Sequence, residues 1–419
     1  MPDYTWGSFS CSRPASSAVC ATVDTGPSGL QCAGLRWQTA RMRSQEYLAA
    51  PPRPLRLAEA VVPAVGRVRV YVCGITPYDV THLGHASTFI WADAADKVLS
   101  WAGNAVTVAR NVTDVDDVLY TEAERRGQDP TLFGALQRAS FEATMATLRV
   151  RTPDLQPTAA QAIGHVIQLA STLLATNNGY LRNGTVYGRT ADAAAASGLT
   201  RDTALTLSAD YHDRPDDADK DDPLDVAVWR SAATGDHREV SWPSPWGPGR
   251  PGWHAECAAM VLALFGPSVD VHCGGADLTY PHHACESALA QAATGVTPFA
   301  RSWLRAGVVA LDGQKMSKSS GNLVLVDDLL RTHSPAAVRL LCLNRPRTET
   351  WSYTTTLLDS AAATLEDLYT AAAKPGTSLI SDSLADALLT DLDVHSAIQI
   401  ALAEGGATTR ALINILALS

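Results

Sequence analysis

A strand, a helix and a second strand follow one another between residues 68 and 112, and this order restricts the fold more than any other feature. The run Val-Arg-Val-Tyr-Val at 68–72 alternates and is β-branched, which is typical of a strand. Residues 84–101 carry apolar side chains at helical spacing and stop before Gly103, and residues 105–112 resemble the first run. We therefore expect an α/β fold in which helices cover both faces of a parallel sheet.

The rest of the chain divides by composition. Residues 1–55 are rich in Ser, Ala, Pro and Gly and are expected to form an extended or disordered leader, with Met42 as an alternative start. A catalytic domain is expected at 56–333, with a Gly-, Asp- and Pro-rich insertion around 150–245. Its second half should supply a helix at 255–265, a strand at 269–272, a helix after Pro281 and a strand near 307–311. A helical domain is expected at 334–419.

Composition limits the class of protein. With 46% hydrophobic and 18% charged residues, the chain can bury a large core. It has no apolar run long enough to span a membrane and no secretory signal, so we expect a cytoplasmic protein without a membrane partner. Eight scattered cysteines do not indicate a disulfide scaffold. The formal net charge of −10 disfavours a nucleic-acid partner, and a monomer is expected.

Two short motifs carry candidate catalytic residues. His82-Leu83-Gly84-His85 stands at the start of the first expected helix, where free backbone N–H groups and the helix dipole favour an anion. Lys315-Met316-Ser317-Lys318-Ser319 follows a strand and a glycine turn, from which two ammonium groups can meet a transferring phosphoryl group. Taken singly, the first could be a helix cap and the second a solvated basic loop.

Together the two motifs resemble the HIGH and KMSKS signatures of the class I aminoacyl-tRNA synthetases, in the same order and context. The resemblance implies a Rossmann-type core that uses ATP with Mg²⁺ to form an aminoacyl-adenylate. It also implies that His82 and His85 bind the α-phosphate in the transition state, and that Lys315 and Lys318 bind the departing pyrophosphate.

Cys73, Cys257 and His282 fall at a strand end, in a helix and at a helix start, where loops converge on the carboxyl edge of such a sheet. Two thiolates and an imidazole would make a soft Zn²⁺ site with one open position, which a substrate thiolate could occupy. Ordinary buried thiols are the alternative. Three segments decide between them, because they resemble the ligand-bearing segments of cysteine-activating enzymes: Cys73–Thr76, Gly252–Cys257 and Pro281–His283.

Two kinds of cysteine-activating enzyme share this core: cysteinyl-tRNA synthetases and the mycothiol-pathway ligases that join cysteine to the amine of glucosaminyl-inositol. Residues 73–79, residues 321–326 and the short tail of 100 residues after Ser319 resemble the ligases. His272, residues 222–225 and Glu286 resemble the synthetases. Glu286 is thus a candidate fourth zinc ligand, with a solvated helix glutamate as the alternative. Residues 213–218, Cys273 and Arg305 depart from the usual ligase pattern.

The resemblance further implies which residues bind cysteinyl-AMP. Trp253 is expected to close over the cysteine side chain. The full set is Cys73, Gly74, Ile75, Thr76, Thr88, Asn111, Val112, Thr113, Trp253, Gly275, Ala276, Asp277 and Val309.

The expected function is an ATP-dependent, AMP-forming ligase that transfers cysteine to the amine of glucosaminyl-inositol, 1D-myo-inosityl 2-amino-2-deoxy-α-D-glucopyranoside. Its substrates would be L-cysteine, ATP and this amine, and it would hold one Zn²⁺. The alternatives are a truncated cysteinyl-tRNA synthetase, a cysteine ligase for another amine, and a non-catalytic zinc- or nucleotide-binding paralogue.

Overall fold

The computed structural model describes residues 53–58, 60–62, 66–78, 80–232, 240–316, 321–375 and 379–419. These residues all belong to one compact unit, Tyr47–Ser419, and a second unit, Met1–Glu46, lies outside the described residues. Most of the leader expected at 1–55 lies outside them too, as does Lys318 of the lysine motif.

Four parallel strands form the main sheet, in the order β10-β9-β3-β4. Its first two strands along the chain are β3 (Arg67–Ile75) and β4 (Ala105–Val112), which are connected by α2 (Leu83–Trp101). The predicted strand–helix–strand unit is therefore confirmed, as is the α/β fold class with its parallel sheet. The helix ends where Gly103 adopts a φ of 88°, a conformation that glycine tolerates without strain.

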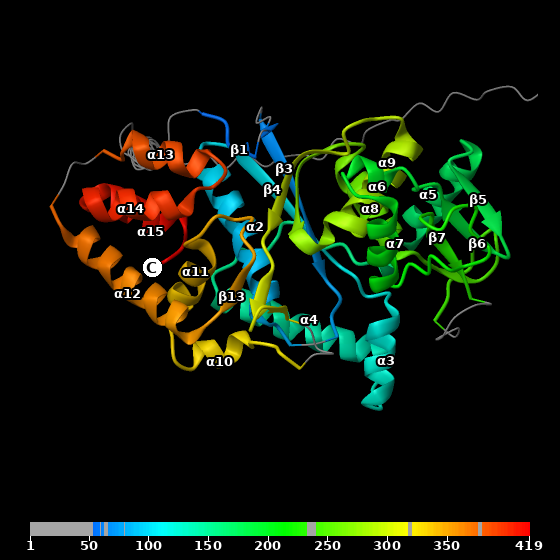
Figure 1. The fold of residues 1–419 in the computed structure, drawn as a ribbon, viewed down its shortest axis with the longest axis horizontal. Helices are drawn as coiled ribbons and strands as arrows, with labels where there is room; N and C mark the ends of the chain where they lie inside the picture. Colours follow the sequence, from blue (N-terminus) through cyan, green and yellow to red (C-terminus); the bar gives the residue numbers. More distant parts are fainter. Residues whose placement is uncertain are drawn as a thin grey trace, which may run out of the picture. The chain divides into compact units, whose positions relative to one another are not determined.

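Side chains of β3 alternate between two hydrophobic cores, one on each face of the sheet. Val68, Val70 and Val72 pack in a core that contains α2 and the C-terminal helices. Tyr71 and Cys73 pack in the other core, with α5 (Ile163–Ala175), α8 (Trp253–Phe265) and α9 (Ala284–Thr294). A strand covered on both faces must be apolar at nearly every position, which explains its sequence. Figure 1 shows α8 and α9 on the opposite side of the sheet from α11.

The second half of the sheet differs from the prediction at its last strand. The fourth parallel strand is β10 (Ala300–Ala306), which pairs with β9 (Val269–Gly275). The strand expected near 307–311 is instead the short β11 (Val309–Leu311), in a separate sheet with β12 (Gln314–Lys315) and β13 (Trp351–Tyr353). Gly307 separates the two strands, because the backbone of residue 349 passes where a Cβ would lie.

The chain between β4 and β9 contributes a separate antiparallel sheet, which Figure 1 shows on the same side of the parallel sheet as α8 and α9. Its strands, in spatial order, are β5 (Gly179–Arg182), β6 (Thr185–Gly188), β7 (Val226–Ser231) and β8 (Gly249–Pro251). The other elements up to residue 283 are β1 (Arg56–Leu57), β2 (Ala60–Val61), α3 (Asp117–Arg125), α4 (Pro130–Thr147), η1 (Ala160–Ala162), α6 (Ala193–Ala196), α7 (Arg201–Asp210), η2 (Ala276–Leu278) and η3 (Thr279–His283).

The described chain after residue 325 is mainly helical, as the sequence predicts, but β13 interrupts the helices because it pairs with β11. Apolar side chains of these helices share one core with α2 and β3. No helix in the described part of the chain combines the length and the apolar character needed to cross a membrane. The helices are α10 (Val326–Leu330), α11 (Pro335–Leu343), α12 (Thr355–Ala373), α13 (Asp382–Leu389), α14 (Val394–Glu404) and α15 (Gly406–Ile415).

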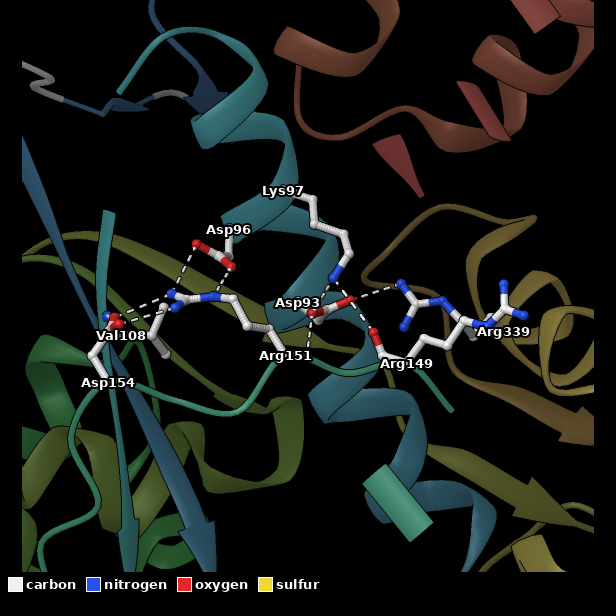
Figure 2. Close-up of polar contacts among 8 residues, drawn as sticks. All are labelled: Asp93, Asp96, Lys97, Val108, Arg149, Arg151, Asp154 and Arg339. Atoms are coloured by element: carbon white, nitrogen blue, oxygen red, sulfur yellow. Dashed lines mark hydrogen bonds and ion pairs between the residues drawn. The ribbon is translucent and has the colours of Figure 1, made fainter. Parts of the chain in front are cut away.

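A buried polar cluster ties these C-terminal helices to α2 (Figure 2). The Arg339 guanidinium of α11 is fully buried and lies 2.7 Å from Oδ2 of Asp93 on α2. It also donates to the backbone oxygens of Leu416, at 3.0 Å, and Leu148, at 2.9 Å. Lys97 Nζ approaches the other Asp93 oxygen at 2.6 Å. A buried charge needs such partners, because desolvation without them is costly.

Candidate active site

A cavity of about 400 Å³, here called the first cavity, opens at the carboxyl ends of β3, β4 and β9. Loops of a parallel sheet converge at this edge, which is where ligands bind in such folds. Most of the predicted site residues line the cavity. They are Cys73, Gly74, Ile75, Thr76, His82, His85, Thr88, Asn111, Thr113, Trp253, Cys257, Gly275, Asp277, His282, Val309 and Lys315.

Two predicted residues, Val112 and Ala276, are not among those that line the first cavity. Val112 is buried on β4 and alternates with its neighbours Asn111 and Thr113, so its side chain points to the opposite face of the sheet. Ala276 begins η2 directly after β9. Their assignment to the cysteinyl-AMP site came from the resemblance and stays a prediction.

The floor of the first cavity depends on a close approach between β3 and β4. The backbone N–H of Gly74 donates to Oδ1 of Asn111 at 2.7 Å, and Nδ2 of Asn111 donates to the Thr113 hydroxyl at 3.3 Å. A Cβ at position 74 would lie 1.6 Å from the Asn111 carbonyl oxygen. Glycine is therefore required here, and the amide of Asn111 is held in a single orientation.

His82 and His85 stand together at the beginning of α2. His82 is the N-cap residue, and its Nδ1 accepts a hydrogen bond from the backbone N–H of Gly84 at 3.1 Å. The two imidazole rings lie 3.8 Å apart between centroids. Desolvation in the crowded cavity lowers the pKa of His85 to about 4, although Asp277 opposes the shift and the residue keeps exposed surface. Both rings face an anion-binding helix end.

Lys315 lies across the mouth of the cavity on β12. Its Nζ is 2.6 Å from Oδ2 of Asp277 and 3.3 Å from the Tyr211 hydroxyl. Burial opposes the charged ammonium, but the Asp277 carboxylate outweighs it and the pKa of Lys315 is raised. A lysine that bonds a carboxylate beside a nucleotide-sized cavity can exchange that carboxylate for a phosphate.

Four predicted metal-binding side chains converge at the first cavity, and three of them, Cys73, Cys257 and His282, line it. The ligand atoms of Cys73, Cys257, His282 and Glu286 all lie within 4.8 Å of one another. Glu286 is 0% exposed, and its Oε1 lies 3.1 Å from Nε2 of His272, which is equally buried. The solvated glutamate considered for position 286 is therefore wrong. Two thiols, an imidazole and a fully buried carboxylate form a donor set that fits Zn²⁺.

Burial controls the protonation of these groups in the absence of a metal. It raises the pKa of the Cys73 thiol well above its usual range, and a hydrogen bond with Cys257 raises it further. The same hydrogen bond lowers the pKa of Cys257, which makes it the readier thiolate of the pair. Desolvation lowers the pKa of His282 to about 3, so its imidazole is neutral, as a metal ligand must be.

Several residues that surround the site were not identified from the sequence. His254 lies between the site and the insertion: its Nδ1 is 3.0 Å from Nδ1 of His282, and its Nε2 is 2.9 Å from Asp213. His272 and His283 are buried beside Glu286 and complete an overlapping candidate metal set with Cys73. The only sequence signal for His254 was its place between Trp253 and Cys257.

Comparison with solved structures identifies the fold. The chain matches a Mycobacterium tuberculosis methionyl-tRNA synthetase in complex with methionyl-adenylate with a TM-score of 0.56 and 16% identity, over 84% of this chain and 82% of the other. It matches a putative arginyl-tRNA synthetase from Campylobacter jejuni with a TM-score of 0.53 and 12% identity, over 91% and 88% of the two chains. At such identities the likeness concerns the fold alone.

The family model described as the tRNA synthetases class I (C) catalytic domain matches residues 60–363. The chain belongs to this family of class I synthetase-type catalytic domains. Among curated proteins, it resembles the L-cysteine:1D-myo-inositol 2-amino-2-deoxy-alpha-D-glucopyranoside ligase of Mycolicibacterium smegmatis, with 42% identity over 78% of this chain and 82% of the relative. The Frankia casuarinae protein of the same description is 40% identical, over 81% and 74%. The resemblance inferred from the motifs is confirmed.

Proposed function

We propose that this chain is an ATP-dependent ligase that forms cysteinyl-AMP and transfers the cysteinyl group to the amine of glucosaminyl-inositol, as in mycothiol biosynthesis. The observation that carries the proposal is that Cys73, Cys257 and His282 are both a candidate metal set and part of the wall of the first cavity. A thiol bound in that cavity can therefore reach the set. The acceptor is inferred from the relatives, whose descriptions name this amine.

In the first step, a carboxylate oxygen of cysteine attacks the α-phosphorus of ATP, and the bond to pyrophosphate breaks. His82 and His85 are placed to bind the α-phosphate, because they stand at the N-terminus of a helix of 19 residues. Lys315, together with Lys318, would hold the pyrophosphate with Mg²⁺. Asp277 then loses its ammonium partner and can bind the ribose hydroxyls.

Selection of cysteine follows from the chemistry of the ligand set. A Zn²⁺ ion held by Cys73, Cys257, His282 and Glu286 would favour the thiolate of cysteine over the hard, weakly acidic hydroxyl of serine. Trp253 stacks on His282 with ring centroids 4.3 Å apart, so its indole covers the side of the set that faces the cavity. Discrimination of this kind needs no editing site.

In the second step, the amine nitrogen of the acceptor attacks the acyl carbon, the bond to the AMP oxygen breaks, and the proton released by the amine passes to solvent. The rate of this step should depend mainly on positioning, because AMP is a good leaving group. We place the reaction in the cytoplasm and infer a monomer that acts on small molecules. The net charge of −10 supports a small acceptor over a nucleic acid.

Three assays test the proposal. Cysteine-dependent exchange of pyrophosphate into ATP should be measurable, and glucosaminyl-inositol should yield an amide while tRNA acquires no cysteine. If tRNA acquires cysteine and glucosaminyl-inositol yields no amide, the protein is a cysteinyl-tRNA synthetase and the proposal is wrong. Absence of exchange in zinc-loaded protein would identify a non-catalytic paralogue.

A further inference from the structure

A second cavity, also of about 400 Å³, lies directly beside the first. The two share the lining residues Thr76, Tyr78, Tyr211 and Trp253, which are called here the shared wall. The Tyr211 and Trp253 rings stack in this wall, with centroids 5.9 Å apart and planes 14° apart. Apart from Thr76 and Trp253 of the shared wall, the described lining of the second cavity contains none of the residues predicted to bind cysteinyl-AMP, and the remaining lining has no part in the function assigned so far.

The second cavity is polar and almost electrically balanced. Asp117 lies between two arginines, 2.9 Å from Arg230 and 2.6 Å from Arg250. The Tyr187 hydroxyl donates to Asp217 Oδ2 at 2.9 Å. Among the described lining residues, five aspartates face four lysine or arginine side chains. A phosphate backbone would require an excess of positive charge, whereas paired acids and bases suit a ligand rich in hydroxyl groups.

The second cavity is built mainly from the start of α3 and from the insertion, both of which are distant in sequence from the lysine motif. Asp117 and Val118 begin α3, and the rest comes largely from the insertion and the loops that flank it. Residues 213–218, where this chain departs from the ligase pattern, contribute Asp213, Arg214 and Asp217.

We propose that the second cavity binds the acceptor, a hydroxyl-rich amine of about two sugar rings. This inference rests on the proposed function, because it requires a cysteinyl-AMP in the first cavity with its acyl carbon at the shared wall. The amine would cross that wall beside Thr76 and Trp253, while carboxylates and guanidinium groups bind the hydroxyls. Pockets of about 300–1,000 Å³ hold ligands of this size.

The first test removes the charge of one lining side chain and nearly preserves the size and shape of that side chain. In Asp217→Asn the new amide oxygen can still accept the Tyr187 hydroxyl, but the charged acceptor for the ligand is lost, as is the hydrogen bond from the backbone N–H of Asp219 to Oδ1. We expect the KM for glucosaminyl-inositol to rise roughly tenfold or more. Asp221→Asn is the matched control, since Asp221 lies four residues away, pairs with Arg182 and Arg189, and lines neither cavity.

The second test fills the cavity from an exposed position. Val118 is 42% exposed on α3 and lines the second cavity, so Val118→Trp adds bulk there without disturbing the core. Leu132→Trp, at a position that is 59% exposed on α4 and lines neither cavity, is its control. We expect a similar rise in acceptor KM for Val118→Trp only.

Both tests are read against cysteine-dependent pyrophosphate exchange, which needs only the first cavity and also reports folding. The proposal predicts exchange within about twofold of wild type in all four variants. Unchanged acceptor KM in both test variants overturns the assignment of the second cavity and leaves the proposed function intact. Loss of exchange in both test variants also overturns it. Wild-type exchange without any amide from glucosaminyl-inositol overturns the proposed function, and the acceptor site with it.

Discussion

At the scale of single residues, the cysteines show how burial and position separate a metal ligand from a core thiol. Cys257 and Cys285 are both buried, at 2% and 1% exposure, and both lie in helices. Only Cys257 has its sulfur near Cys73, His282 and Glu286. The same argument applies to Glu286, whose carboxylate is fully buried beside the His272 imidazole, because a buried carboxylate is costly unless it meets a cation.

Replacement of Cys257 by serine should therefore remove zinc. The hydroxyl of serine does not ionise near neutral pH, so we expect zinc affinity to fall at least about tenfold. Metal content after dialysis against a chelator, measured by atomic emission, checks this. Cys285→Ser makes the same change in an equally buried thiol and should retain the metal. Full zinc content and full discrimination against serine in Cys257→Ser would contradict the ligand assignment.

At the scale of elements, the sequence predicted α2, β3 and β4 to within three residues, because strand alternation and helical spacing are local patterns. It failed at β10 and β11, where one apolar stretch is divided between two sheets at Gly307. What divides it is the backbone near residue 349, which is distant in sequence. Local patterns carry no information about such an approach.

The contact of β3 with β4 at Gly74 gives a prediction at this scale. In Gly74→Ala the added methyl would collide with the Asn111 carbonyl, so we expect a loss of about 3 kcal/mol or more in unfolding free energy. Gly164→Ala, in α5 with no atom within 4 Å of the added carbon, should instead stabilise by about 0.4–1 kcal/mol. Denaturant unfolding of both variants measures the difference. Equal unfolding free energies of the two variants would show that β3 and β4 can move apart at position 74 without a loss of stability.

At the scale of the whole molecule, the described C-terminal helices and the nucleotide-binding sheet share one hydrophobic core. The Arg339–Asp93 pair lies within this core and joins α11 to α2, the helix that carries His82 and His85 at its start (Figure 2). We therefore expect that destabilisation of the C-terminal helices also destabilises α2, and with it the position of His82 and His85.

Loss of the Arg339 guanidinium tests this coupling. Arg339→Met leaves a buried carboxylate with fewer partners, and we expect about 3–5 kcal/mol of destabilisation in a single cooperative transition. Arg331→Met, at a side chain that is 77% exposed, should change stability by no more than about 0.5 kcal/mol. Thermal unfolding followed by circular dichroism distinguishes them. A separate early transition in Arg339→Met would mean that the C-terminal helices unfold independently.

The sequence by itself determined the strand–helix–strand unit, the two nucleotide motifs and three of the four candidate zinc ligands, since each depends on short patterns or on a motif resemblance. Only the tertiary structure decided that Glu286 is buried against Cys73 and Cys257, that His254 connects His282 to Asp213, and that a second cavity adjoins the first. These features depend on distances between residues far apart in the chain. Periodicity indicates which face of an element is buried, but packing alone decides which side chains meet there.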